Sequence, residues 1–253
     1  MILGMQQLMD TDEAADVLGV SRMRVRQLVA QGDLPARRAS GVLLLDAAMV
    51  HLRAAAEVSA GRPVSTVQAW RIANVIESHV RPTASADVTT ARLGRVRGRI
   101  RELASEPSVG ALAWRLRRRS AAALRLSAHP SVVSRMSTDA RLVISGPQAA
   151  RSLGADLVPD GSIEAYVDGE DLADVIAEHA LLDAGRSPNV MLRRVDGLTG
   201  MVGGSARVGT PPLRSAPVLL VATDLADHGD VRAASVAADL WADLRSQLID
   251  LTG

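Results

Sequence analysis

The chain has 253 residues, 47% of them hydrophobic, which is enough for two or three domains with a real hydrophobic core. It has no Cys and no run of eighteen apolar residues, which excludes disulfides and thiolate zinc sites and predicts neither a membrane span nor a membrane partner. Its 29 basic residues are all Arg, and because residues 1–128 hold 19 Arg against 11 acids while residues 129–253 hold 10 against 17, the first half is the one suited to bind a polyanion.

Residues 13–32 show the pattern of two short helices joined by a tight turn. Asp10 and Glu13 have the spacing of a capping box before the first helix, Gly19 lies at the turn, and Ser21 is placed to cap the second helix. Small Ala15 lets the two helices cross closely. The expected core faces are Ala14, Ala15 and Leu18 in the first helix and Val25, Leu28 and Val29 in the second.

A two-stranded wing is expected directly after these helices. Gly32 should end the second helix, since Gly is common just past helix C-termini. Residues 34–38 and 42–45 then form two strands around a turn at Ser40 and Gly41. Asp46 is expected to cap a third helix that runs to about Ala56.

The second helix should present a basic face to solvent, because it carries no acid between Arg22 and Gln31. Arg can bond a guanine edge through two nitrogens, Gln can do the same with adenine, and wing arginines can hold phosphates. The predicted DNA-binding residues are Ser21, Arg22, Met23, Arg24, Arg26, Gln27, Arg37 and Arg38. An ordinary solvated basic helix face is the alternative interpretation.

These first fifty-five residues resemble the excisionase and MerR-like winged helix-turn-helix family. The matching residues are Ala14-Ala15, Leu18-Gly19-Val20-Ser21, Val25-Arg26, Gly32-Asp33-Leu34-Pro35 and Arg37. The resemblance implies a DNA-binding domain over residues 1–58 whose partner is double-stranded DNA.

Residues 59–128 are expected to form a basic, all-helical region. One helix starts at Ser65, a second follows Thr89 or Thr90, and a third runs from Val109 to about Leu126. Trp70 and Trp114 are expected in the core. The arginine rows of this region, at residues 92–101 and 117–119, leave three interpretations open: further contacts with DNA, a solvated surface, or a docking face for the acidic second half.

Residues 129–253 alternate between strands and helices, which predicts an α/β or α+β partner-binding domain and an α+β chain overall. Asp230 should cap the last helix. The expected strands are residues 141–145, 163–167 and 190–195, and the expected helices are residues 147–154, about 169–179 and about 231–248.

The segment from Ile144 to Gly154 resembles the opening of the minimal nucleotidyltransferase fold, in which a strand, a small turn and a helix precede a strand with two spaced carboxylates. Here that strand has Glu164, but Tyr166 stands where a second acid is needed and Asp168 falls past the strand. The five His share no metal-ligand spacing. We therefore predict a degenerate fold of this kind with no catalytic residue, metal ligand or cofactor.

The order of parts is similar to the type IV abortive-infection (AbiEi-like) antitoxins, on residues Leu142 to Gly154, Ile163 to Val167 and Val221 to Leu225. That resemblance implies a cytoplasmic regulator that represses its own operon, with a nucleotidyltransferase-like toxin as partner; a homodimer on paired half-sites is a further possibility. Two alternatives remain: a recombination directionality factor, and a nucleotidyltransferase-fold enzyme. The first five residues lack the basic region of a secretory signal.

Overall fold

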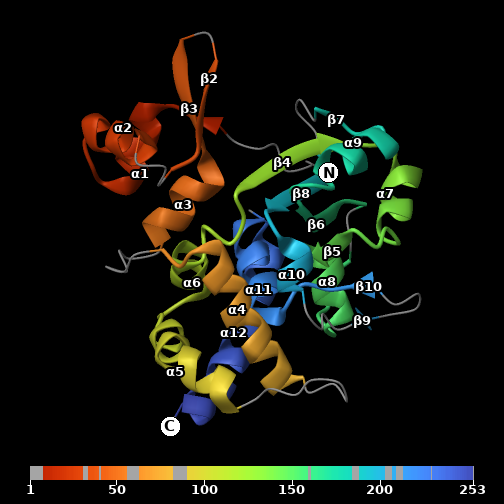
Figure 1. The fold of residues 1–253 in the computed structure, drawn as a ribbon. Coiled ribbons are helices and arrows are strands. Elements are labelled where there is room, and N and C mark those ends of the chain that lie inside the picture. Colours follow the sequence, from red (N-terminus) through yellow and green to blue (C-terminus); the bar gives the residue numbers. More distant parts are fainter. Residues whose placement is uncertain are drawn as a thin grey trace.

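The computed structural model describes residues 8–30, 34–39, 41–55, 63–81, 90–158, 161–183, 188–202, 207–208, 213–228 and 230–252. Figure 1 shows a small N-terminal domain standing beside a larger body. Each part has its own hydrophobic cluster. The chain is therefore a mixed α+β protein with helices and sheets in both parts.

The N-terminal domain has the two predicted helices, α1 (Thr11–Leu18) and α2 (Arg22–Ala30). Asp10 and Glu13 form the predicted capping box: the Asp10 carboxylate accepts the backbone N–H groups of Asp12 (2.7 Å) and Glu13 (3.0 Å), and the Glu13 carboxylate accepts that of Asp10 (2.9 Å). The pKa of the Asp10 carboxyl is lowered by these backbone donors. Gly19 turns the chain with φ 64°, a left-handed conformation that favours Gly.

A three-stranded antiparallel sheet follows the helices. Its strands β2 (Ala36–Ala39) and β3 (Val42–Asp46) form the predicted wing, and β1 (Leu8–Met9), which is too short to detect in sequence, adds to the other edge of β3. Helix α3 (Ala47–Ala55) then leads to the body. Gly32 and Ser40, which were predicted to end α2 and to form the hairpin turn, lie outside the described residues.

The body is built around a five-stranded sheet in the order β5-β6-β8-β4-β7. The pair β6–β8 is parallel and the other three pairs are antiparallel. The strands are β4 (Ala122–Ser127), β5 (Leu142–Ser145), β6 (Ile163–Asp168), β7 (Leu182–Asp183) and β8 (Val190–Val195); a separate hairpin has β9 (Arg207–Val208) and β10 (Leu213–Arg214).

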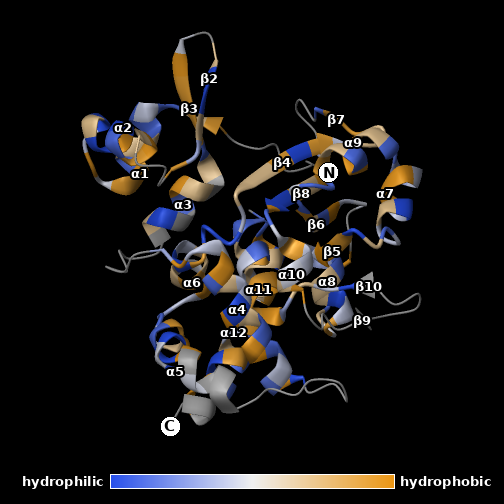
Figure 2. Cartoon of the chain, viewed as in Figure 1, coloured by the Kyte–Doolittle hydropathy of each residue, from blue (hydrophilic) through white to orange (hydrophobic). Residues whose placement is uncertain are grey.

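Helices cover this sheet and extend away from it (Figure 1). Helix α11 lies in the middle of the body, is buried from Val218 to Leu225, and is mostly hydrophobic in Figure 2. The helices of the body are α4 (Thr66–Val80), α5 (Thr90–Ala104), α6 (Val109–Arg115), α7 (Pro130–Met136), α8 (Gly146–Ser152), α9 (Leu172–Glu178), α10 (Leu198–Met201), α11 (Val218–Asp227) and α12 (Val231–Thr252).

The predicted helix from Val109 to about Leu126 is wrong. Helix α6 ends at Arg115, and residues 122–127 form strand β4, which lies between β8 and β7. Ala and Leu favour helices locally, but here the backbone of Ala122 to Leu126 pairs residue for residue with β8. Tertiary pairing therefore overrides the local preference.

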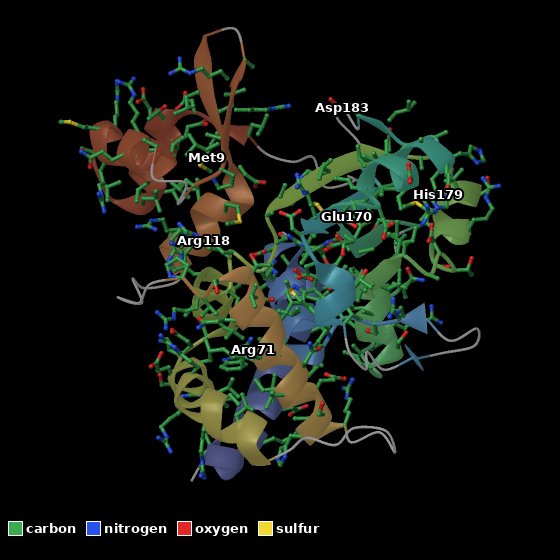
Figure 3. The ribbon with its side chains drawn as sticks, in the orientation of Figure 1. Met9, Arg71, Arg118, Glu170, His179 and Asp183 are labelled. Atoms are coloured by element: carbon green, nitrogen blue, oxygen red, sulfur yellow. The ribbon has the colours of Figure 1, made fainter. Side chains whose placement is uncertain are left out.

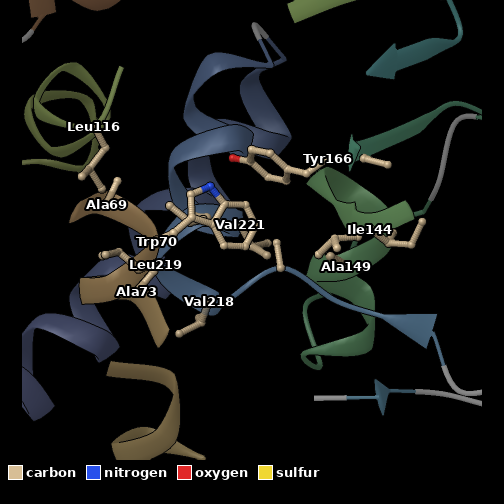
Figure 4. Packing of buried hydrophobic residues seen from close by; sticks show 14 of the residues in the cluster. Ala69, Trp70, Ala73, Leu116, Ile144, Ala149, Tyr166, Val218, Leu219 and Val221 are labelled. Atoms are coloured by element: carbon tan, nitrogen blue, oxygen red, sulfur yellow. The ribbon is translucent and has the colours of Figure 1, made fainter. Parts of the chain in front are cut away.

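One hydrophobic cluster joins segments that the sequence analysis placed in different regions, 59–128 and 129–253. Trp70 on α4 is fully buried and meets Tyr166 on β6 edge to face, with ring centroids 4.9 Å apart. The Trp70 indole N–H donates to the backbone oxygen of Arg119 at 3.1 Å. Figure 4 shows both rings among side chains of α8 and α11, so the helices of the middle region complete the core of the sheet.

The N-terminal domain contacts the body through α3, which packs on α6 and α11. At one end of α3, Asp46 forms an ion pair with Arg125 of β4 at 2.9 Å. Near the other end, the Arg53 guanidinium lies 4.5 Å from the ring centroid of Trp114, and Arg117 lies 3.9 Å from the same ring. Contacts at both ends of one helix fix the domain against the body.

None of the helices in the described ranges combines the length and the hydrophobicity needed to cross a bilayer.

Two glycine substitutions test the backbone geometry in opposite directions. Gly98 is exposed on α5 with open space where a Cβ would point, so Gly98→Ala should raise stability by about 1 kcal/mol and Tm by roughly 2–4 °C. Gly146 has φ +61°, and a Cβ there would lie 2.9 Å from Glu164 Cδ. Gly146→Ala should therefore lower stability by roughly 2 kcal/mol. Thermal unfolding of both variants checks this, and equal shifts in Tm would contradict it.

Candidate nucleic-acid interface

Helix α2 is anchored on a small core of its own. Val25 and Leu28 are buried, and the backbone N–H of Arg24 donates to Ser21 Oγ at 3.3 Å, which is the predicted cap. The other buried members of this cluster are Met9, Ala14, Ala15, Leu34, Leu45, Ala47 and Val50. This packing fixes which side of α2 faces inward and leaves the opposite side in solvent.

The six predicted DNA-binding residues on or next to α2 are all exposed: Ser21, Arg22, Met23, Arg24, Arg26 and Gln27. With 3.6 residues per turn, Met23 and Gln27 lie opposite the buried side, Arg26 on one flank and Arg24 on the other. Met23 is 69% exposed, an unusual position for a large apolar side chain. Arg24 Nη1 donates to Gln27 Oε1 at 3.3 Å, which holds these two side chains together.

A groove of about 740 Å³ lies between α2 and the hairpin. Arg22 and Arg26 line it from α2, and Arg38 lines it from β2. Asp10 and Asp12 also line the groove, and the Asp12 carboxylate forms an ion pair with Arg22. The groove is therefore basic along α2 and β2, with an acidic end at the start of α1.

The two wing arginines lie on opposite faces of the hairpin, because side chains alternate along a strand. Arg38 lies opposite Leu43 in the register and lines the groove. Arg37 belongs to the other face, the one that carries Asp46 and its ion pair with Arg125. Both arginines are exposed, but the structure brings only Arg38 next to α2.

Among the described arginines of residues 90–119, two are buried, Arg117 is half-buried and four are exposed. Arg115 is buried beside Glu102 (3.7 Å) and Glu106 (3.2 Å), and Arg119 is buried beside Asp224 (2.7 Å). The exposed ones are Arg97, Arg99, Arg101 and Arg118. Figure 3 shows Arg118 where α3 meets the body. Arg119 thus fulfils one of the three interpretations, contact with the acidic second half.

A buried charged cluster, which the sequence analysis did not predict, lies between the sheet and α11. Its centre is the fully buried carboxylate of Asp224. Asp224 Oδ1 accepts from Arg119 Nε (2.7 Å) and Tyr166 Oη (3.1 Å) and lies 3.1 Å from Arg193 Nε, while Ser145 Oγ donates to Oδ2. The sequence feature that could have indicated this cluster is a single acid, Asp224, inside the apolar run from Val218 to Leu225.

Two carboxyls of this cluster have pKa values shifted in opposite directions. Burial alone raises the pKa of Asp224, but Arg193 and Arg119 outweigh it, so the pKa of Asp224 is lowered. For Asp227, which ends α11 and also pairs with Arg119, burial dominates and its pKa is raised. Asp227 is the last residue of helix α11.

The acids considered for a metal site are engaged in other contacts. Asp168 is the last residue of β6, not past it, and its carboxylate accepts the backbone N–H groups of Thr199 (3.0 Å) and Gly197 (3.3 Å). Glu164 Oε1 bonds His228 Nδ1. No group of three or more His, Asp or Glu in the described ranges has the arrangement of a metal site. Asp230 caps α12 as predicted, accepting the N–H of Ala233 at 3.0 Å.

Replacing the central carboxylate of the cluster tests its contribution to stability. Asp224→Asn removes the charge between Arg119 and Arg193, so we expect a loss of about 3–5 kcal/mol in the free energy of unfolding at neutral pH. Because the folded pKa of Asp224 lies below its unfolded value, its contribution is present above about pH 4 and is lost as pH falls.

Urea denaturation between pH 3 and pH 7 measures this loss. The matched control is Asp243→Asn at an exposed position of α12, which should change stability by less than about 0.5 kcal/mol. Equal effects of the two substitutions would contradict a central role for Asp224.

Comparison with known proteins supports the N-terminal assignment. Residues 8–48 match the family model described as "Helix-turn-helix domain". The comparisons with curated proteins and with solved structures found no match. Residues 8–48 thus form a helix-turn-helix domain, and the match covers α1, α2 and both strands of the wing.

Proposed function

We propose that this chain is a DNA-binding transcriptional regulator that reads duplex DNA with α2. The observation that carries the proposal is the exposed face of α2, with Arg24, Gln27 and Met23 on a helix whose other side is packed in a helix-turn-helix core. In such domains the second helix enters the major groove, where base edges present distinct donors and acceptors.

The side chains of α2 divide between base reading and backbone contact. Gln27 and Met23 point straight out and would reach deepest; Gln can bond adenine and Met can contact a thymine methyl group. Arg24, held beside Gln27, is positioned for a guanine on the neighbouring base pair. Arg26 lines the groove from α2 and Arg38 lines it from β2, and the two would hold a phosphate strand between α2 and the wing.

Alanine substitutions separate these two roles. Arg24→Ala and Gln27→Ala should each cost roughly 1–3 kcal/mol on the best site and relax the base preference there. Arg38→Ala should weaken binding to all sequences alike. It should also reduce the slope of log affinity against log salt concentration by about 1, the value for one phosphate contact. Arg37→Ala should have the smaller effect, because Arg37 lies on the other face of the hairpin.

The measurement is site selection from a random duplex library, followed by Kd at several salt concentrations. Arg135→Ala serves as the control, since Arg135 is exposed on α7 and Figure 1 shows α7 far from α2. If neither α2 variant differed from this control, α2 would not be the reading helix.

The Asp12–Arg22 ion pair offers a test with the opposite sign. Asp12 places a carboxylate at the end of the basic groove, where it would repel a phosphate strand. Asp12→Asn removes this charge and releases Arg22, so binding to unrelated duplexes should become several-fold tighter. Asp16→Asn, an exposed acid on the same helix, is the control; tighter binding in both variants would point to net charge alone.

We also propose a more specific role, an antitoxin that represses its own operon and binds a nucleotidyltransferase-like toxin. Support comes from the resemblance to the AbiEi-like antitoxins over residues 142–154, 163–167 and 221–225. These residues occupy β5, α8, β6 and α11, around the buried charged cluster of Asp224. The test is co-expression with the product of the adjacent gene. If the two proteins form no complex and co-expression does not relieve growth arrest, the antitoxin role is overturned. The DNA-binding proposal would then remain intact.

For the body we propose no catalytic activity. Support comes from the carboxylates of Glu164 and Asp168, which bond His228 and the turn at residues 197–199. Nucleotidyl transfer by the full chain that disappears in Glu164→Gln would overturn this.

A further inference from the structure

We propose that the exposed side of α5 is a second DNA-contact surface, which binds the phosphate backbone of the duplex beside the site held by α2. This surface, called the α5 face, comprises Gly94, Arg97, Gly98, Arg99, Arg101 and Glu102. The inference rests on the proposed function and adds a sequence-independent contact from the body. Its partner is the phosphodiester backbone of duplex DNA.

The charge of this segment favours a polyanion. Residues 90–119 contain nine Arg and two Glu. Arg115 and Arg119 are buried, whereas Arg97, Arg99 and Arg101 are exposed on α5. A helix that serves only as a solvated surface usually mixes both signs of charge.

The shape of the α5 face also fits a nucleic-acid backbone. Val96, Ile100 and Leu103 bury the inner side of α5, so Gly94 and Gly98 lie near the middle of the outer side. No atom lies within 4 Å of the position that a Cβ would take at either glycine. Packing therefore does not require these glycines, although each costs about 1 kcal/mol in a helix.

Arginines lie on both flanks of this shallow centre. At 100° per residue, Arg97 and Arg101 fall on one flank, and Glu102 and then Arg99 fall on the other. Glycine permits close approach of a ligand to the backbone, so a phosphate strand lying over the glycines would meet the guanidinium groups of Arg97 and Arg101. On the other flank Glu102 lies nearer to the glycines than Arg99, from which it accepts a hydrogen bond at 2.6 Å.

Helix α5 lies on the same side of the molecule as α2 (Figure 1). Figure 1 shows α2, α3, α6 and α5 following one another along that side. The contacts at both ends of α3, Asp46 with Arg125 and Arg53 with Trp114, fix α2 relative to the body. The labelled acid Asp183 lies on the opposite side, away from such a duplex (Figure 3).

The experiment varies the length of DNA outside the recognised site. Full-length protein is titrated with duplexes that carry the selected site and either no flank, 10 bp or 20 bp of random sequence on each side, at several KCl concentrations. The variant is Arg97→Gln/Arg99→Gln/Arg101→Gln. The control is Arg135→Gln/Arg151→Gln/Arg232→Gln, three exposed arginines on α7, α8 and α12.

We expect longer flanks to tighten binding of the native protein and of the control at least 10-fold. The α5 variant should not show this gain, should keep its affinity for the duplex without flanks, and should have a salt slope smaller by about 2–3, one unit for each phosphate that it no longer neutralises. Glu102→Gln removes the acid of the α5 face, so it should increase the gain in affinity that the flanks produce.

The results distinguish this inference from the proposed function. Flanks that give no gain, or a gain that the α5 variant retains, overturn the α5 face. The inference is also overturned if the α5 face binds poly-glutamate while the flanks have no effect on DNA binding. If the native protein prefers no duplex sequence, the proposed function fails instead. If the triple variant does not fold, the response of Glu102→Gln decides: an unchanged flank gain overturns the inference.

Discussion

The carboxylate of Asp224 is the interaction on which the body depends. It joins four segments that are distant in sequence: Arg119 after α6, Ser145 at the end of β5, Tyr166 on β6 and Arg193 on β8. A buried carboxylate is stable only when charge and hydrogen bonds replace its water, and here guanidinium and hydroxyl groups do so. Tyr166 also meets Trp70, so the same cluster positions α4 against the sheet.

This cluster explains why the helices of residues 59–128 pack as part of the body. Arg119 holds the end of the α6 segment against α11, and strand β4 starts three residues later between β8 and β7. A fragment beginning at residue 129 would lack β4 and expose the edge of β8, so the second half has no complete sheet by itself. Through α6 and Trp114, the same segment carries the contact with α3. The sheet, the buried cluster and the position of the helix-turn-helix domain are thus connected through residues 109–127.

What the sequence predicts well is what short-range chemistry determines. The capping box of Asp10, the left-handed Gly19 and the apolar spacing of Val25 and Leu28 act within a few residues, and the resulting domain follows the expected pattern. Strands β5, β6 and β8 were also predictable, because each is a short apolar run between turns. The contact between Arg119 and Asp224 was not predictable, because the two residues are 105 positions apart and no local sequence feature indicates that they pair. Strand β4 was mispredicted for the same reason: its partner β8 lies far along the chain.

The excess of arginine in the chain includes buried and exposed side chains, which the sequence alone does not distinguish. Part of the excess arginine is internal: Arg115, Arg119 and Arg193 neutralise acids inside the body and are not available to a ligand. Exposed arginines lie on α2, on the wing and on α5, and further ones lie on α7, α8 and α12. Long-range attraction depends on the charges that face solvent, because buried pairs cancel at a distance. The arginines that can attract a polyanion are therefore the exposed ones, and α2 and α5, which carry two groups of them, lie along one side of the molecule (Figure 1).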